Sequence, residues 1–475
     1  MSRLWFWLAI LTLILFGRIF QSEVLWPEEG LPLAAAQELL GGRTLYRDIW
    51  FDKPPLLAWF YAGVVGLGGH SGYGLRLIGV LYILAITATG WGLSRRLFGE
   101  TEARWTALFL AFFTSFYLPS AVAPLAADLM LVLPHLAVFY WLAAGRAWAA
   151  GLAAGLGFHL NPKALLVLAA AALWSRLEGR LRGDVAPLAM GFAAAAGVVL
   201  AAVGLQGGWS GYVEQVWQWG AGYAGVRFTE RPWALGVERT LAWAGFHAAL
   251  VVGAAAVASR RWRLAGWLAV SCLGVVAGAR FFPRYYFQIL PPLAVAAGAG
   301  WARLGRRRIW IVALAVALAV PAVRFGRVNL WLAMRRDFAW RDAAIDADSR
   351  RAAEIVRRAC APSDRILVWG FRPEIYYYSQ RRAASRYLET QALAGVLADR
   401  HLERSEAFEP EAARLRRQQL AQQLGRQPPA VIVDGLGRYN AGLSFENQRE
   451  LAPLLGLYQV AGETGGAIVY RLSGQ

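Results

Sequence analysis

The chain has 475 residues, of which 57% are hydrophobic and only 17% are charged, and it contains 22 tryptophans. Soluble domains carry about one quarter charged residues, so this composition excludes an ordinary soluble protein and indicates several membrane spans. The formal net charge of +18 does not indicate nucleic-acid binding, because the basic residues separate apolar runs and form no continuous surface. Membrane topology and contact with lipid phosphates explain them better. Cys272 lies in an apolar run and Cys360 in the polar tail, so no disulfide is predicted.

The apolar runs predict about eleven spans, each judged against the roughly 20 residues that cross a bilayer. They lie near residues 4–20, 74–93, 104–122, 129–145, 147–160, 164–175, 186–206, 240–259, 264–279, 285–302 and 309–323. The first run has no small-residue cleavage site and is therefore expected to remain as a span. The fifth and sixth runs are short, and the Asn161–Pro162 break between them predicts a helical pair.

The stretch from Leu56 to Gly69 decides the orientation of the whole chain. It is apolar and glycine-rich but only about 14 residues long, so it is expected to lie at the interface or to re-enter. The arginine clusters at 95–104, 176–182, 260–263 and 303–308 then share the side of the N-terminus, which the positive-inside rule makes the cytoplasm. The chain is thus predicted to be a multi-pass protein of the inner (plasma) membrane.

The densest cluster of ionisable residues lies between Trp26 and Leu57, in the run WPEEGLPLAAAQELLGGRTLYRDIWFDKPPLL. Directly after the first apolar segment it places Glu28, Glu29, Asp48, Asp52 and Lys53. Such a cluster at the mouth of a membrane helix is costly unless it is hydrated or functional. In the predicted orientation Asp128, Lys163, Arg280 and Arg284 reach the same outer face. Ionisable residues from five segments then meet at one level of the membrane, as they would in a site.

Several of these residues also have a purely structural interpretation. The stretch from Pro27 to Glu29 is a good helix start, with proline first and acids in the first turn, and Gly41–Gly42 would end that helix. Asp52 could cap the helix that the two prolines open, and Asp128 could cap the next apolar run. Lys163 could simply extend to the membrane interface.

The functional interpretation assigns roles in a group transfer. Glu28 would take a proton from an acceptor hydroxyl, an effect worth roughly 10²–10⁴ in rate. Lys53 is a compact cation that suits a phosphate, and Asp52 could hold that lysine or bind a divalent metal. Arg280 and Arg284 flank an aromatic run, where they either belong to an interfacial belt or clamp a lipid phosphate.

The tail changes character after about residue 335. Short β-rich runs alternate there with helical patterns, at 365–370, 430–435 and 467–472. This alternation predicts a small α/β domain over 335–475, following a polytopic helical membrane domain over 1–330 whose active-site loop is 21–73. An odd number of spans would place the C-terminal domain outside the cytoplasm. The five histidines show no metal-ligand spacing, which argues against a zinc hydrolase.

The run WPEEG…AQELLGGRTLYRDIWFDKPPLLAWF is similar to the first external loop of the GT-C superfamily of glycosyltransferases. The branch it resembles holds protein O-mannosyltransferases, aminoarabinose transferases of lipid A and lipopolysaccharide-core transferases. That family shows an Asp-Glu pair after the first span, then a helix, a Gly-rich turn and an acid-Lys-Pro-Pro-Leu motif. Further matches are Asp128, the NPK around Lys163, the RYYFQILPPLAV run and a C-terminal domain with DRILVWGFRPEIYYYS.

The resemblance implies an inverting transfer of a sugar from a polyprenyl-phosphate donor to a lipid, glycan or protein acceptor at the outer face. Glu28 takes the place of the family acid, usually Asp, that is assigned as base or acceptor-positioning group. Glu29 matches the second acid, and Asp128 would position or tune the base. Glu28 is one methylene longer than the usual residue, which is a departure from the family.

The same resemblance assigns the donor phosphate to Lys53, Lys163, Arg280 and Arg284, and it gives Asp52 as the acid that can bind a divalent metal. The loop 207–235 lacks the histidine that supplies a second metal ligand in some members, so no cofactor is certain. Relatives often show histidine where this chain has Arg284, and arginine still serves a phosphate.

A lipid-linked sugar transporter without transferase activity is the alternative. A transporter would place charges near the bilayer midplane on broken helices and would show repeat symmetry. Here the charges gather at one face and no repeat is evident. The sequence therefore favours the enzyme.

Overall fold

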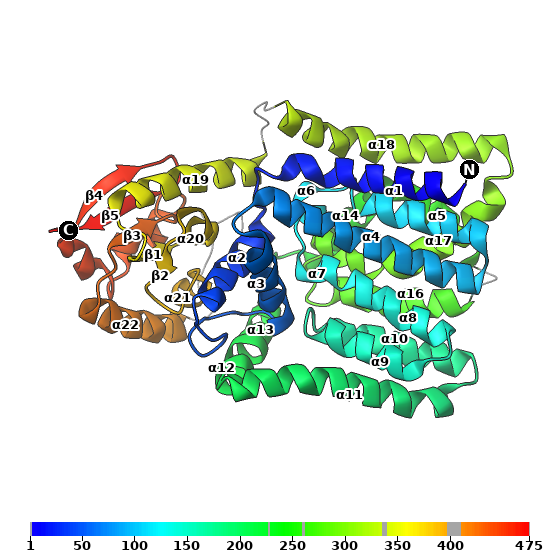
Figure 1. Ribbon diagram of the computed structural model, residues 1–475, viewed down its shortest axis with the longest axis horizontal. Helices are drawn as coiled ribbons and strands as arrows, with labels where there is room; N and C mark the ends of the chain where they lie inside the picture. The colour runs from blue at the N-terminus through cyan, green and yellow to red at the C-terminus, as the bar shows by residue number, and fades with distance from the viewer. Residues whose placement is uncertain (1, 227–228, 259–261, 335–339, 397–409, 475) are drawn as a thin grey trace.

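The computed structural model describes residues 2–226, 229–258, 262–334, 340–396 and 410–474. Long apolar helices run side by side and form a bundle, with an α/β region that holds the C-terminus at one end (Figure 1). In these ranges four segments are long and apolar enough to cross a membrane. The first consists of an α-helix extended by the short 3-10 helix η1 (Ile19–Gln21), and each of the others is a single α-helix. The four segments are α1 (Arg3–Arg18) with η1, α4 (Gly72–Leu97), α11 (Leu181–Leu205) and α18 (Arg308–Ala333).

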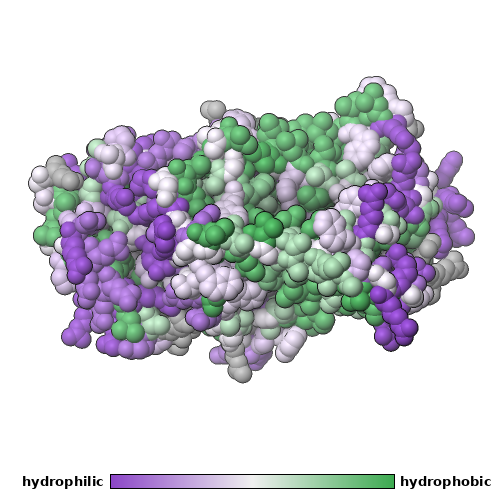
Figure 2. Space-filling view, turned by 60° about the horizontal axis from the view of Figure 1, so that its bottom comes forward, coloured by the Kyte–Doolittle hydropathy of each residue, from purple (hydrophilic) through white to green (hydrophobic). Residues whose placement is uncertain are grey.

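Shorter helices complete the bundle. They are α5 (Glu100–Phe113), α6 (Pro119–Val122), α7 (Ala127–Met130), α8 (Val132–Ala143), α9 (Ala147–Phe158), α10 (Ala164–Leu177), α14 (Pro232–Phe246), α15 (Ala248–Ala255), α16 (Trp262–Val276) and α17 (Leu290–Leu304). The surface between the two ends of the molecule is largely apolar, whereas hydrophilic residues gather at both ends (Figure 2). Such a band is what the hydrocarbon core of a bilayer requires.

Two predicted spans are interrupted in the structure. The helix expected over 104–122 ends at Phe113, where the Thr114 hydroxyl donates to the Leu110 carbonyl at 2.6 Å and the chain turns before Pro119. The helix expected over 240–259 breaks at His247, and its last residue lies outside the described residues, as does part of the arginine cluster at 260–263. The predicted helical pair around Asn161–Pro162 is confirmed as α9 and α10. The count of eleven spans stays a prediction.

Two helices lie across the end of the bundle, next to the C-terminal region (Figure 1). They are α2 (Pro27–Leu40) and α3 (Pro55–Gly68), and they pack against each other. The predicted helix start is confirmed: Pro27 occupies the first position, and Glu29 Oε2 accepts a hydrogen bond of 2.9 Å from the Trp26 backbone. The helix ends at Gly41–Gly42 as predicted, and Gly42 has a φ of 87°, a conformation that favours glycine.

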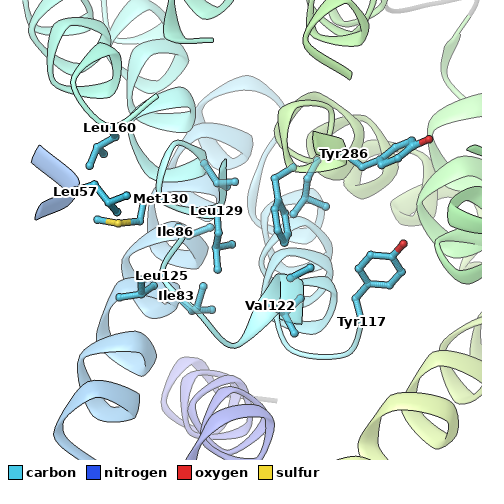
Figure 3. Packing of buried hydrophobic residues seen from close by; sticks show 14 of the residues in the cluster. Leu57, Ile83, Ile86, Tyr117, Val122, Leu125, Leu129, Met130, Leu160 and Tyr286 are labelled. Carbon is cyan, nitrogen blue, oxygen red and sulfur yellow. The ribbon is translucent and has the colours of Figure 1, made fainter. Parts of the chain in front are cut away.

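Buried apolar side chains fix the position of α3 and α7. Leu57 from the first turn of α3 points toward Leu160 and Met130 (Figure 3). Leu129 and Met130 are both buried, at 0% and 1% exposure, directly after Asp128. In a bilayer, where lipid is as apolar as these side chains, close packing of this kind is what holds helices together. The packed core therefore fixes the positions of Asp128 within α7 and of Asp52 and Lys53 directly before α3.

The C-terminal region, residues 340–474 as described, contains a mixed sheet of order β2-β1-β3-β5-β4. Its strands are β1 (Arg365–Trp369), β2 (Arg382–Ala383), β3 (Val431–Asp434), β4 (Tyr458–Glu463) and β5 (Ile468–Leu472). Strand β1 pairs in parallel with both β2 and β3, and β5 pairs in antiparallel with both β3 and β4. Its helices are α19 (Arg341–Ala359), α20 (Glu374–Ser379), α21 (Gln391–Ala394) and α22 (Pro410–Arg426). The three predicted strands are present as β1, β3 and β5.

Candidate active site

A single arginine links two carboxylates from different parts of the chain. Arg284 Nη1 lies 2.6 Å from Glu28 Oε1, and Arg284 Nε lies 3.6 Å from Asp128 Oδ2. Glu28 comes from the first turn of α2 and Asp128 from α7, whereas Arg284 lies in the 3-10 helix η4 (Pro283–Gln288). All three side chains are 11–30% exposed, so the group remains accessible from solvent.

The break between α9 and α10 brings a second cation to Asp128. Lys163 Nζ lies 2.9 Å from Asp128 Oδ1, and Asn161 Nδ2 donates to the same oxygen at 3.0 Å. The Asn161 amide oxygen in turn accepts from the Lys163 backbone at 3.0 Å. The Lys163 ammonium also lies 3.5 Å from the centre of the Tyr285 ring, where the ring quadrupole attracts a cation. The NPK turn therefore positions Lys163 beside Asp128.

The loop before α3 supplies a third cation. Lys53 Nζ pairs with Asp52 Oδ1 at 3.0 Å, and the Lys53 carbonyl accepts a hydrogen bond of 2.7 Å from the Tyr46 hydroxyl. Burial by itself would lower the pKa of Lys53, but the negative charges of Asp52, Glu28 and Glu389 outweigh burial and raise it. Lys53 therefore remains protonated and lies within electrostatic reach of Glu28.

Glu29 lies apart from this cluster. Its two carboxylate oxygens accept from Arg76 Nη1 at 2.5 Å and Nη2 at 2.7 Å, and both side chains are buried, at 0% and 1% exposure. Arg76 also donates to the carbonyls of Gln21 at 3.0 Å and Val24 at 2.7 Å. The structure thus does not bring Glu29 to the predicted catalytic group, because a residue of α4 holds it in the interior.

Arg280 and Asp48 also have partners of their own. The Arg280 guanidinium bonds to the Tyr223 carbonyl and lies 3.8 Å from the centre of the Tyr223 ring. It is 2% exposed, and it packs against α13 (Trp219–Gly225), whereas Arg284 contacts the carboxylates. Asp48 forms an ion pair of 2.8 Å with its exposed neighbour Arg47. The predicted phosphate contact of Arg280 has no geometric support here.

The carboxylates do not form a set that fits a divalent metal. In the described ranges no group of three or more His, Cys, Asp or Glu side chains is arranged to hold a metal ion. Asp52, the predicted ligand, stands in its pair with Lys53, and Glu28 in its pair with Arg284. A cation beside each carboxylate opposes a second positive charge at the same oxygen.

Sequence reasoning missed one acidic residue that faces the cluster. Glu389 comes from the C-terminal region and interacts electrostatically with Asp52, Lys53 and Glu28. Burial, followed by the nearby charge of Asp52, raises the pKa of Glu389 to about 7, although Lys53 acts in the opposite direction. No local motif marks this position, since the contact depends on how the C-terminal region folds back onto the loop before α3.

Residues 52–203 match the model of a family described as dolichyl-phosphate-mannose-protein mannosyltransferase, PMT_2. Over these residues the chain is similar to the PMT_2 family of GT-C glycosyltransferases. The matched range contains Asp52, Lys53, Asp128 and Lys163. The predicted resemblance is confirmed, as is the predicted enzyme class, a glycosyltransferase family that uses polyprenyl-phosphate sugars. No curated protein matches the chain.

Solved structures share the fold over almost the whole chain. The structure of ArnT from Cupriavidus metallidurans bound to undecaprenyl phosphate superposes with a TM-score of 0.65 at 16% identity, covering 98% of this chain and 97% of that one. Its apo state gives a TM-score of 0.63 at 16% identity, with the same coverage of 98% and 97%. The Archaeoglobus fulgidus oligosaccharyltransferase in complex with Zn and sulfate gives 0.52 at 13% identity, covering 98% and 73%. The chain is thus a multi-pass membrane protein with a mostly helical ArnT-like fold and a small C-terminal mixed sheet.

Proposed function

We propose that this protein transfers a sugar, with inversion, from a polyprenyl-phosphate donor to a hydroxyl of a lipid, glycan or protein acceptor at the outer face of the membrane. The observation that carries the proposal is the contact of Arg284 with both Glu28 and Asp128. It joins a candidate base to a set of cations suited to a phosphate, at the end of the apolar bundle.

The arrangement supplies a base for the acceptor hydroxyl and cations for the leaving phosphate, which are the two groups that a single displacement needs. The Glu28 carboxylate takes the proton of the acceptor hydroxyl while that oxygen attacks the anomeric carbon of the donor. The bond between this carbon and the phosphate oxygen breaks, and its electron pair stays on the phosphate, whose negative charge rises by one. Lys53, Lys163 and Arg284 stabilise that charge, and their stabilisation grows as the bond breaks. One displacement at the anomeric carbon inverts its configuration.

The location of the cluster suits a lipid-linked donor. Glu28 lies in the first turn of α2 and Lys53 directly before α3. These two helices lie across the end of the bundle (Figure 1), and the surface is apolar between the two hydrophilic ends of the molecule (Figure 2). A polyprenyl chain would remain in the hydrocarbon while its phosphate reached the cations. The ArnT structure with undecaprenyl phosphate is a precedent for such a ligand in this fold.

Replacement of Glu28 by Gln tests the proposal. Glutamine keeps the shape of the side chain and still accepts a hydrogen bond from Arg284, but it cannot take up the proton of the acceptor. We expect sugar transfer to fall by roughly 10²–10⁴ while binding of undecaprenyl phosphate persists. Glu28→Asp restores the acid usual in the family and should keep substantial activity. Near-normal transfer by Glu28→Gln would remove the base assignment and leave Asp128 as the next candidate.

The transporter alternative predicts a different result for the unmodified protein. Purified protein in vesicles would move a lipid-linked sugar across the bilayer and would form no glycosidic product with any acceptor supplied. That outcome would refute the transferase function as a whole, independently of Glu28.

A further inference from the structure

The cluster holds more carboxyl groups than cations among the described residues. Four carboxyl side chains meet three basic side chains there, namely Glu28, Asp52, Asp128 and Glu389 against Lys53, Lys163 and Arg284. The phosphodiester of a polyprenyl-phosphate sugar would add another negative charge. Like charges repel, so a proton on one carboxyl balances the group before the donor binds and reduces the excess negative charge once the donor is present.

Glu389 is brought to this position by contacts between the segment that follows β2 and the loop before α3. The Trp50 backbone donates to the Arg386 carbonyl at 2.7 Å, and Arg386 Nη2 donates to the Tyr46 carbonyl at 2.9 Å. The rings of Trp50 and Tyr387 lie 5.4 Å apart. The segment that follows β2 is thereby fixed to the loop that carries Asp52 and Lys53.

The residues around Glu389 are fixed on the other side as well. The Thr390 backbone donates to the Gly370 carbonyl at 3.1 Å, and both Leu388 and Thr390 are 1% exposed. Gln391 Nε2 donates to Glu389 Oε1 at 2.6 Å. This bond engages one carboxyl oxygen of Glu389.

We propose that Glu389 binds the phosphate of the lipid-linked donor, with its neutral carboxyl group donating a hydrogen bond to a phosphate oxygen. The inference rests on the proposed function and extends it, since it assigns a residue of the C-terminal region to the donor site. The charged groups that face Glu389 are Asp52 and Lys53 from the loop before α3 and Glu28 from α2.

The protonation of Glu389 gives the binding a defined pH dependence. Its pKa of about 7 means that the carboxyl group is mostly neutral at pH 6 and mostly ionised at pH 8.5. An approaching phosphate anion favours the neutral form further, because the charged form would repel it. Donor affinity should therefore fall as the pH rises through 7. A carboxyl far from the donor, or one that does not titrate between pH 6 and 8.5, would impose no such dependence.

The experiment compares the full-length protein with its Glu389→Gln variant in binding of undecaprenyl phosphate at pH 6 and pH 8.5. Glutamine mimics the neutral carboxyl and does not titrate. At 1.5 pH units above the pKa only about 3% of Glu389 is protonated, so the unmodified protein should lose up to roughly 30-fold more affinity than the variant does over this range. The probe phosphate also titrates near pH 6, and the difference between the two proteins removes its contribution.

Glu374→Gln is the matched control. Glu374 is a buried carboxyl of the same region whose Oε1 accepts from Ser349 Oγ at 2.6 Å, and it is not among the charged groups that act on Glu389. This variant should keep the pH dependence of the unmodified protein. Thermal unfolding of each variant reports whether it is folded, and Glu389→Asp keeps a titrating group if Glu389→Gln is unstable.

The inference would be overturned if donor affinity changed with pH by the same factor in the unmodified protein and in Glu389→Gln. This includes the case in which the variant binds more weakly than the unmodified protein by the same factor at both pH values. The binding assay is independent of sugar transfer. A protein that bound the probe with the expected pH difference but transferred no sugar would leave the role of Glu389 standing and would refute only the transferase function.

Discussion

Adjacent glutamates in the first turn of α2 should respond in opposite ways to the same substitution. Glu29→Gln keeps the side-chain shape but leaves the Arg76 cation without its carboxylate in a site where both groups are at most 1% exposed. Breaking a buried ion pair by removing one partner costs about 3–5 kcal/mol, because the remaining charge stays desolvated. Arg18, a second buried cation within electrostatic reach of Arg76 and Glu29, places this variant toward the upper part of that range.

Glu28→Gln provides the matched control for stability. The Glu28 side chain is 22% exposed and its pair with Arg284 faces solvent. Exposed pairs contribute about 0–1 kcal/mol, so this variant should unfold close to the temperature of the unmodified protein. Its defect should appear in sugar transfer.

The assay is thermal unfolding of the detergent-purified variants, combined with transfer activity per folded molecule. Glu29→Gln should unfold several degrees lower than Glu28→Gln, and the fraction that remains folded should transfer sugar at a rate near that of the unmodified protein. If Glu29→Gln instead kept its unfolding temperature and lost transfer, the ion pair with Arg76 would not be the role of Glu29. The catalytic assignment that the sequence suggests would then be correct.

Three further predictions concern the cations and the orientation. Lys53→Ala should raise the KM for a polyprenyl-phosphate donor while the protein is expressed at its normal level. Lys53→Arg should restore part of the donor use, because the charge returns without the compact geometry. An unchanged KM in Lys53→Ala would remove Lys53 from the site. Asp128→Asn should lower transfer about tenfold or more, because Lys163 is no longer held in place to stabilise the charge that develops on the phosphate, and a titration with donor should show the loss mainly in kcat. Reporter cysteines at Gly69 and at Arg306 should label from opposite sides of the membrane, and labelling from the same side would mean that the segment between the prolines and Gly69 spans.

Local patterns in the sequence predicted the parts of the site that depend on local structure. The helix that begins at Pro27 and the break at Asn161–Pro162 follow from proline, glycine and capping preferences, and both are present. The contacts of Arg284 with Glu28 and Asp128 agree with the predicted meeting of these residues at one level. That prediction rested on the length of the helices, which fixes where each segment leaves the membrane.

The remaining features depend on packing between distant segments. Nothing in the pair Glu28–Glu29 indicates which acid turns inward, because the answer lies in Arg76, which is 47 positions away along the chain and on another helix. Strand β2 has only two residues, too few for a recognisable pattern. Strand β4 is mostly exposed, so it lacks the alternation of a half-buried strand.

Helix α2 is held from two sides, and this explains how Glu28 is presented. Near its start Glu29 bonds to Arg76 of the bundle, whereas near its end the buried Glu38 accepts from the Ala383 backbone at 2.8 Å and pairs with Arg382 at 3.2 Å. Both anchors use carboxylates that the helix buries. The bundle and the C-terminal region therefore fix the helix together, and Glu28 is left on the side that faces the cations. A site built in this way depends on the C-terminal region even before Glu389 is considered, because that region sets the position of the base.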